Sequence, residues 1–138
     1  MAEKTKPPAA HGIRNFNDLI AWQRARDLVK AIYECTHGFP LEEMYGLVSQ
    51  LRRAAVSVPS NIAEGYGRGA RKEYVRFLRT ARGSLYEVQT QLLLAQDLGY
   101  LSTAKANEIL QLAGRCCQLL NGLLRGLAKQ DSNGDTHA

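Results

Sequence analysis

The sequence has few cysteines and histidines and no long apolar run, and each shortage excludes a class of protein. Its three cysteines are an odd number, and Cys116 is adjacent to Cys117, so neither a disulfide framework nor a Cys-x-x-Cys zinc or redox site is expected. Every apolar run is far shorter than the roughly 18 residues that a membrane span needs. The first residues also lack the apolar stretch of a secretory signal. We therefore expect a soluble, cytoplasmic protein with free, buried thiols.

What the chain does have is apolar residues at helical spacing. Its 138 residues are enough for one domain. Steps of three and four residues predict four helices, with ends at Asn17 or Asp18 to about His37, about Leu41 to Gly65, 70–98, and Ser102 or Thr103 to about Lys129. Pro59 should kink or interrupt the second of these. Short connections favour an all-α, antiparallel up-down-up-down bundle over 13–129, with disordered tails at 1–12 and 130–138.

The third predicted helix carries an unusual charge pattern. Between positions 68 and 82 it has one acid, Glu73, so this stretch accounts for the whole formal net charge of +5. At about 100° per residue the cations share one arc of about 140°, opposite the apolar face: Arg68, Arg71, Lys72, Arg76, Arg79 and Arg82. Glutamates are missing from the i+4 positions that would pair them. The arc is either a solvated outer face or a surface that binds a polyanion, and the two are evenly matched.

Two helices have more apolar surface than a single bundle needs. Beside the cations on the third helix lie Val75, Tyr86 and Leu93, which favour a contact with another chain over a platform for stacked bases. The apolar face of the fourth helix is widened by Leu110, Cys117 and Leu124. The first helix could cover that excess, but we favour an oligomer interface. Three glycines of the fourth helix are expected to permit close helix approach: Gly114, Gly122 and Gly126.

Catalytic and metal sites find little support. His37 is the one histidine outside the predicted tails, and it sits where a helix C-terminus favours imidazolium. The string Gly65-Tyr66-Gly67-Arg68-Gly69 follows a helix and lacks the Gly-Lys-Ser/Thr of a phosphate loop. Asn61 and Glu64 either tie this turn or line a polar site. We expect no enzyme, catalytic residue, metal or cofactor.

A long ordered string of residues carries a resemblance. It comprises Phe39-Pro40, Glu43, Tyr45-Gly46-Leu47, Gln50-Leu51-Arg52-Arg53-Ala54-Ala55, Ser57-x-Pro59-x-Asn61-Ile62-Ala63-Glu64-Gly65, Phe77-Leu78, Ala81, Gly83-Ser84, Glu87 and Gly99-Tyr100-Leu101. With Leu19-x-x-Trp22, this string resembles the bacterial four-helix-bundle family of 23S rRNA intervening-sequence (S23) proteins over roughly residues 14–125. Its most specific part holds the motif residues Pro59, Asn61, Glu64 and Gly65.

The resemblance implies a ring-shaped homopentamer and no catalytic residues. The accessory protein of diversity-generating retroelements is similar in shape, and it is a basic pentamer that binds nucleic acid and a reverse transcriptase. The matched basic positions are Arg52, Arg53 and Arg68. Relatives often place Ser or Thr at the start of the third helix, where this chain has Ala70.

These observations predict a non-enzymatic, pentameric helical bundle that binds RNA or DNA through the arginine-rich face of its third helix. The first alternative is a scaffold that docks an acidic protein partner, such as a reverse-transcriptase-type enzyme. A second alternative is an enzyme that uses Asn61, Glu64 and Arg68 in a polar pocket beside the turn.

Overall fold

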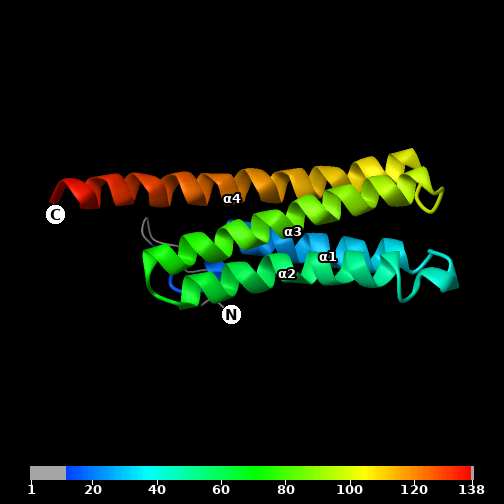
Figure 1. The fold of residues 1–138 in the computed structure, drawn as a ribbon, viewed down its shortest axis with the longest axis horizontal. Coiled ribbons are helices and arrows are strands. Elements are labelled where there is room, and N and C mark those ends of the chain that lie inside the picture. Colours follow the sequence, from blue (N-terminus) through cyan, green and yellow to red (C-terminus); the bar gives the residue numbers. More distant parts are fainter. Residues whose placement is uncertain (1–11, 138) are drawn as a thin grey trace, which may run out of the picture.

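The computed structural model describes residues 12–137 and the side chains up to residue 130. Four α-helices and two short 3-10 helices follow one another in this part (Figure 1), in the order η2 (Phe16–Asp18), α1 (Ile20–Thr36), η3 (Leu41–Glu43), α2 (Leu47–Gly67), α3 (Arg71–Asp97) and α4 (Thr103–His137). No strand occurs among the described residues, so the prediction of an all-α fold with four helices is confirmed. The predicted N-terminal tail lies outside the described residues, apart from Gly12.

The core lies between the four helices, each of which packs against two others (Figure 1). Its largest fully buried side chains include Leu28, Ile32, Leu51, Leu85 and Leu120. Most of the predicted apolar stripes are buried, but Met44 is 48% exposed. The reason is the helix boundary, since α2 begins only at Leu47 and Met44 belongs to the connection before it.

The helices also differ from the predictions at the start of α1, at Pro59 within α2 and at the end of α4. Neither Asn17 nor Asp18 caps α1, because the preceding turn is η2, where Asn15 Oδ1 accepts the Asn17 N–H at 3.3 Å. α2 continues through Pro59 without interruption. α4 continues to His137, beyond the predicted end at Lys129 and into the segment predicted to be a tail, since no proline there ends its hydrogen-bond ladder.

The ends of α3 are set by two glycines with positive φ. Gly69, at φ +83°, precedes the first turn, and Gly99, at φ +81°, follows the last. At the latter end the Tyr100 N–H donates to the Ala95 carbonyl at 2.9 Å and the Gly99 N–H to the Gln96 carbonyl at 3.0 Å. This pair of bonds is a Schellman motif, which ends α3 at Gly99.

The motif of α2 builds its contact with α3. Ser57 Oγ and Ser84 Oγ are 2.8 Å apart, and Asn61 Nδ2 donates to the Ser57 carbonyl at 2.8 Å and to Ser57 Oγ at 2.9 Å. One turn further along α2, a Cβ added at Gly65 would lie 2.6 Å from Phe77 Cβ. Close helix approach therefore occurs at Gly65. Around Gly114 and Gly126 no atom lies within 4 Å of an added Cβ, and at Gly122 only the flexible Arg125 side chain does, so these three glycines mark no close helix approach within the described chain, and such an approach between chains stays a prediction.

Candidate nucleic-acid interface

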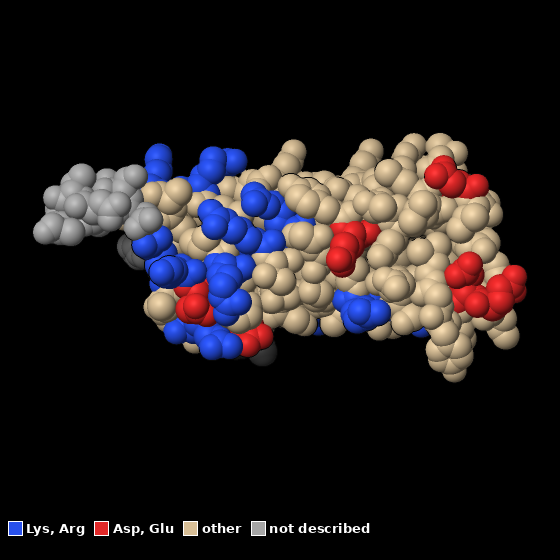
Figure 2. All heavy atoms as spheres, in the orientation of Figure 1, with Lys and Arg blue, Asp and Glu red and all other residues tan. Residues whose placement is uncertain are grey.

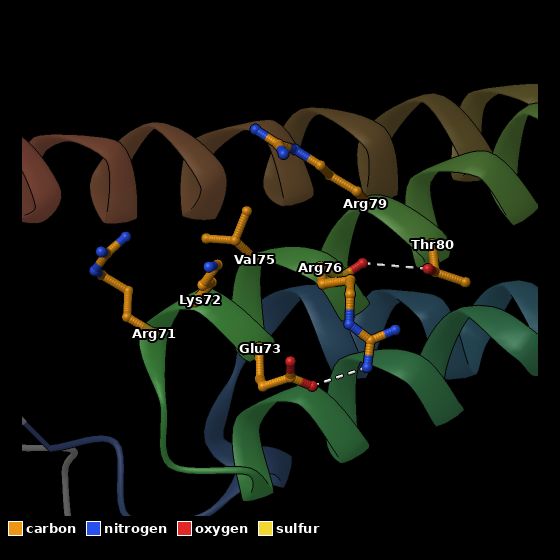
Figure 3. Close-up of a pocket in the computed structure, with 7 residues that line it drawn as sticks. All are labelled: Arg71, Lys72, Glu73, Val75, Arg76, Arg79 and Thr80. Carbon is orange, nitrogen blue, oxygen red and sulfur yellow. Dashed lines mark hydrogen bonds and ion pairs between the residues drawn. The ribbon is translucent and has the colours of Figure 1, made fainter.

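The basic residues of α3 lie along its first three turns, where the helix runs beside α4 (Figure 3). They surround a hollow of ≈ 690 Å³ whose lining includes Arg71, Lys72, Val75, Arg76 and Arg79. In Figure 3 Arg71 and Arg79 extend from α3 on the side of α4, and Arg76 points away from it. The structure thus brings four of the eight predicted nucleic-acid contacts to one place.

Arg76 and the neighbouring Arg68 are held by acids and by an aromatic ring. The Arg76 guanidinium is 2.8 Å from Glu73 Oε1, and that of Arg68 is 2.9 Å from Glu64 Oε2. Both also stack on the Phe77 ring, at 4.6 Å for Arg76 and 5.1 Å for Arg68. The hydrogen bond from Arg76 holds the pKa of the Glu73 carboxyl below its ordinary range, so Glu73 is ionised and offsets much of the Arg76 charge.

Arg82 serves the packing of two helices. Its Nη1 donates to Asn121 Oδ1 of α4 at 2.9 Å, and the side chain is half-buried. Part of the hydrogen-bonding capacity of this guanidinium is therefore used inside the chain. A substitution at Arg82 would disturb the α3–α4 contact as well as any ligand.

Lys72 and Arg79 are two cations of the hollow whose side chains are left without an ion pair, because Glu73, the acid in the same lining, pairs with Arg76. Both are exposed and line the hollow, and neither has an ion pair or hydrogen bond within the described part of the chain. Seven residues apart, they stand about 10 Å from each other along the helix axis. That separation spans one or two phosphate steps of an extended strand, so both can contact the same polyanion.

Arg52 and Arg53 lie elsewhere. Arg52 Nε donates to Thr36 Oγ1 at 2.9 Å and its guanidinium stacks on the Tyr33 ring at 4.5 Å, which anchors α2 to the end of α1. Arg53 is exposed on α2. Arg68, directly after the end of α2, is fifteen positions further along the chain, about 22 Å along the helix axis. The structure does not bring these two arginines into the basic face of α3.

α4 supplies basic residues that the sequence analysis missed. Asn121, the partner of Arg82, is followed at four-residue steps by Arg125 and Lys129, both exposed. Residues at this spacing share a face of a helix, and the face that holds Asn121 borders α3. Lys and Arg gather over this end of the molecule, while Asp and Glu gather over the opposite end (Figure 2). The spacing of Asn121, Arg125 and Lys129 at i, i+4 and i+8 is the sequence signal by which this basic face of α4 could be recognised.

The predicted interface residues have mixed surroundings. Tyr86 and Leu93 are 51% and 48% exposed on α3, and Val75 is partly buried in the hollow. On α4 the predicted contacts Leu110, Cys117 and Leu124 are partly buried against the core, because α4 packs on both α1 and α3. Packing on two helices of the same chain thus accounts for the wide apolar face of α4. The role of these residues in an oligomer interface stays a prediction.

None of the three residues considered for catalysis lines the hollow at the turn between α2 and α3. Glu64 ties the turn through Arg68, and Asn61 is bonded to Ser57 inside the bundle. The hollow of ≈ 250 Å³ at this turn has Tyr66 and Tyr74 in its wall, but neither Asn61 nor Glu64. Burial raises the pKa of Tyr74 to about 12, so its hydroxyl is protonated at neutral pH.

Over residues 12–130, no group of three or more His, Cys, Asp or Glu side chains is placed to hold a metal ion. Cys35, Cys116 and Cys117 are free, and burial raises the pKa of Cys116 to about 12 and that of Cys35 to about 11. None of the described helices is long and apolar enough to span a bilayer.

Comparisons with known proteins agree with the resemblance carried by the motif. The model of the 23S rRNA-intervening sequence protein family matches residues 17–122. A crystal structure of a protein with unknown function from the S23 ribosomal protein family of Bacteroides thetaiotaomicron is similar with a TM-score of 0.68 and 17% identity. The similarity covers 75% of this chain and 97% of that one, and it supports the four-helix fold. No curated protein matches the sequence.

Proposed function

The chain belongs to the 23S rRNA-intervening sequence protein family, and from that premise we propose that it is a non-enzymatic, homopentameric, up-down-up-down bundle that binds RNA or DNA through the basic face of α3. One observation carries the proposal. Lys72 and Arg79 are exposed, line one hollow and make no ion pair or hydrogen bond in the described structure, and Glu73, the acid of that hollow, is paired with Arg76. A solvated face normally mixes charges of both signs, and an unopposed pair is what a polyanion neutralises.

The contacts expected of such a surface are with phosphates. Lys and Arg at a helix surface neutralise the backbone and position the strand, but they read little sequence. Arg125 and Lys129 extend the basic area onto α4, so a strand could cross both helices. Several copies in one assembly would contact the same strand and multiply the affinity.

Binding to labelled RNA and DNA across a salt series tests the proposal. We expect Lys72→Glu/Arg79→Glu to lose most binding at about 100 mM salt. Each lost phosphate contact should lower the slope of log K against log salt by about 0.7 for single strands and about 0.9 for B-DNA. The matched control Lys30→Glu/Arg115→Glu makes the same charge change at exposed positions of α1 and α4 away from the hollow, and it should keep a wild-type slope. Equal losses in both variants would contradict the proposed site.

Assembly is tested separately. Light scattering of the purified protein should give about five times the monomer mass of 15.3 kDa. A stable monomer at micromolar concentration would overturn the oligomer while leaving the basic face open to test.

A second candidate is the docking of an acidic protein partner, such as a reverse-transcriptase-type enzyme, on the same face. The observation that favours it is Val75, an apolar side chain among the cations of the hollow. A complex that survives nuclease treatment and is lost in Lys72→Glu/Arg79→Glu would favour this candidate. A complex that nuclease dissolves would favour nucleic acid.

A further inference from the structure

The end of the bundle opposite the basic face is a rigid platform. This end, called the tip here, consists of the 37–46 and 98–102 connections with the adjoining helix ends (Figure 1). The Phe39 and Tyr100 rings pack across it at 5.4 Å. Glu43 joins both connections, because its Oε2 accepts from the Tyr100 hydroxyl at 2.9 Å and its Oε1 accepts from the Leu47 N–H at 2.9 Å.

This platform presents large apolar side chains to solvent. Tyr45 is 94% exposed, Leu41 79% and Leu98 58%. Met44 and Leu94, next to them in the chain, are also exposed. Single exposed apolar residues are ordinary, but several gathered on one preorganised surface, with a Tyr among them, are typical of a protein contact.

Tyr45 is the most exposed of these large apolar residues, and packing within the described chain does not account for it. It belongs to the string Phe39-Pro40, Glu43, Tyr45-Gly46-Leu47, and its neighbours there have structural roles. Phe39 is buried, Glu43 joins the two connections, and a Cβ at Gly46 would lie 2.7 Å from Glu43 Oε1. Tyr45 has no hydrogen bond or ring contact in the described part of the chain. These structural neighbours fix the backbone around Tyr45, whereas its own side chain has no such structural role in the described part of the chain.

The charge of the tip is acidic. Apart from His37, the charged side chains of 33–47 and 94–108 are Glu34, Glu42, Glu43, Asp97, Lys105 and Glu108. Arg52 of α2 also reaches this end, where its guanidinium is held by Thr36 and the Tyr33 ring, so five acids stand against two cations. The one lysine is 3.4 Å from Glu108 Oε1. Figure 2 shows Asp and Glu side chains, and few Lys or Arg, over the end of the molecule away from the main group of basic side chains. An anionic surface of this kind repels nucleic acid and anionic lipid and attracts cations.

We propose that the tip is a docking surface for a cationic amphipathic segment of another protein, with Leu41, Tyr45 and Leu98 as the apolar anchors and the surrounding carboxylates as partners of its lysines and arginines. The acidic charge and the exposed apolar side chains of the tip are complementary to a ligand that is both cationic and apolar. The basic end of a second copy has suitable charge, but end-to-end docking of identical chains does not close and produces filaments. A different polypeptide is therefore the occupant, and nucleic acid could be held at the other end at the same time.

The test uses a fluorescein-labelled helical peptide of about 18 residues built from leucine and lysine at helical spacing, with a leucine–glutamate peptide as the control ligand. Anisotropy titration of the full chain should show saturable binding of the cationic peptide only. Leu41→Ser/Tyr45→Ser should weaken it by about tenfold or more. Glu42→Lys, which leaves the apolar anchors in place, should weaken it as well.

The matched control is Ile20→Ser/Val56→Ser, which removes two exposed apolar side chains from α1 and α2 outside the tip and should bind within about twofold of wild type. Circular dichroism verifies that every variant keeps its helices. The proposal is overturned if no saturable binding occurs below about 1 mM peptide, if the acidic peptide binds equally, or if Leu41→Ser/Tyr45→Ser binds as the wild type does. Light scattering that grows with protein concentration at low salt, and is lost in Leu41→Ser/Tyr45→Ser, would assign the tip to a second copy instead.

Discussion

Adding one methyl group at Gly65 tests the closest approach between α2 and α3. The new Cβ would lie 2.6 Å from Phe77 Cβ, 3.2 Å from Tyr74 Cδ1 and 3.4 Å from the Tyr74 carbonyl oxygen. Phe77 Cβ is bonded directly to the α3 backbone, so no rotation of its side chain relieves the contact. One helix must move by close to 1 Å, which places the cost near the upper end of the roughly 1–3 kcal/mol for overpacking. Alanine returns about 1 kcal/mol of helix propensity, so Gly65→Ala should lower the free energy of unfolding by about 2 kcal/mol.

Urea unfolding followed by helical circular dichroism, at one fixed protein concentration, measures this difference. Gly114→Ala is the matched control, because an added Cβ there has no atom within 4 Å and only the propensity gain of up to about 1 kcal/mol remains. The two substitutions should therefore move the midpoint in opposite directions. If Gly65→Ala is as stable as the wild type or more so, the helices are farther apart than the structure has them, and the reasoning fails.

Three further substitutions test the packing of α2 and the tip. Hydrogen bonds, chiefly from the Leu47 N–H, hold the pKa of Glu43 below its ordinary 4.5. The carboxylate therefore contributes stability above pH 4.5, and this contribution is lost as the pH falls through the lower pKa of the folded state. Urea midpoints at about pH 7 and pH 3 should differ less in Glu43→Gln than in the wild type, and an equal difference would contradict this. Ser84→Ala should cost about 1 kcal/mol in urea unfolding, since its bond to Ser57 is lost, and a loss above about 3 kcal/mol would show that the polar contact has another role. Pro59→Ala should raise the melting temperature, because it restores an N–H in the middle of α2, and a lower value would mean that the proline is required for packing.

Helical periodicity predicted the fold well because the bundle buries one stripe of each helix. The ends were harder, since they depend on contacts between distant residues. The start of α1 follows from the Phe16 ring packing edge-on against Trp22 at 5.2 Å, and the exposure of Met44 follows from the late start of α2. Apolar periodicity identifies the middle of a helix but does not predict the structure that precedes its first turn.

The charged site was predictable as an arc but not as a set of contacts. A search for glutamates four residues after each cation misses Glu64, which lies four residues before Arg68 and pairs with it. The anchoring of Arg52 by Thr36 and of Arg82 by Asn121 depends on how separate helices align, which a single helical wheel does not contain. The eight predicted contacts therefore divide into cations that hold the fold and cations, chiefly Lys72 and Arg79, that have capacity left for a ligand.

The separation of charge along the bundle constrains how copies can be arranged. α3 has 27 residues, so it spans about 40 Å between the basic end and the tip. In the proposed ring, a cyclic axis parallel to the helices would place every basic end on one rim and every tip on the other. Five basic ends on one rim give a strand several sites within reach, and five tips on the other give a second ligand the same advantage. An arrangement with alternating chain directions would instead put acid beside base on each rim and cancel the field that attracts either ligand. The unopposed charge at each end thus favours parallel chains.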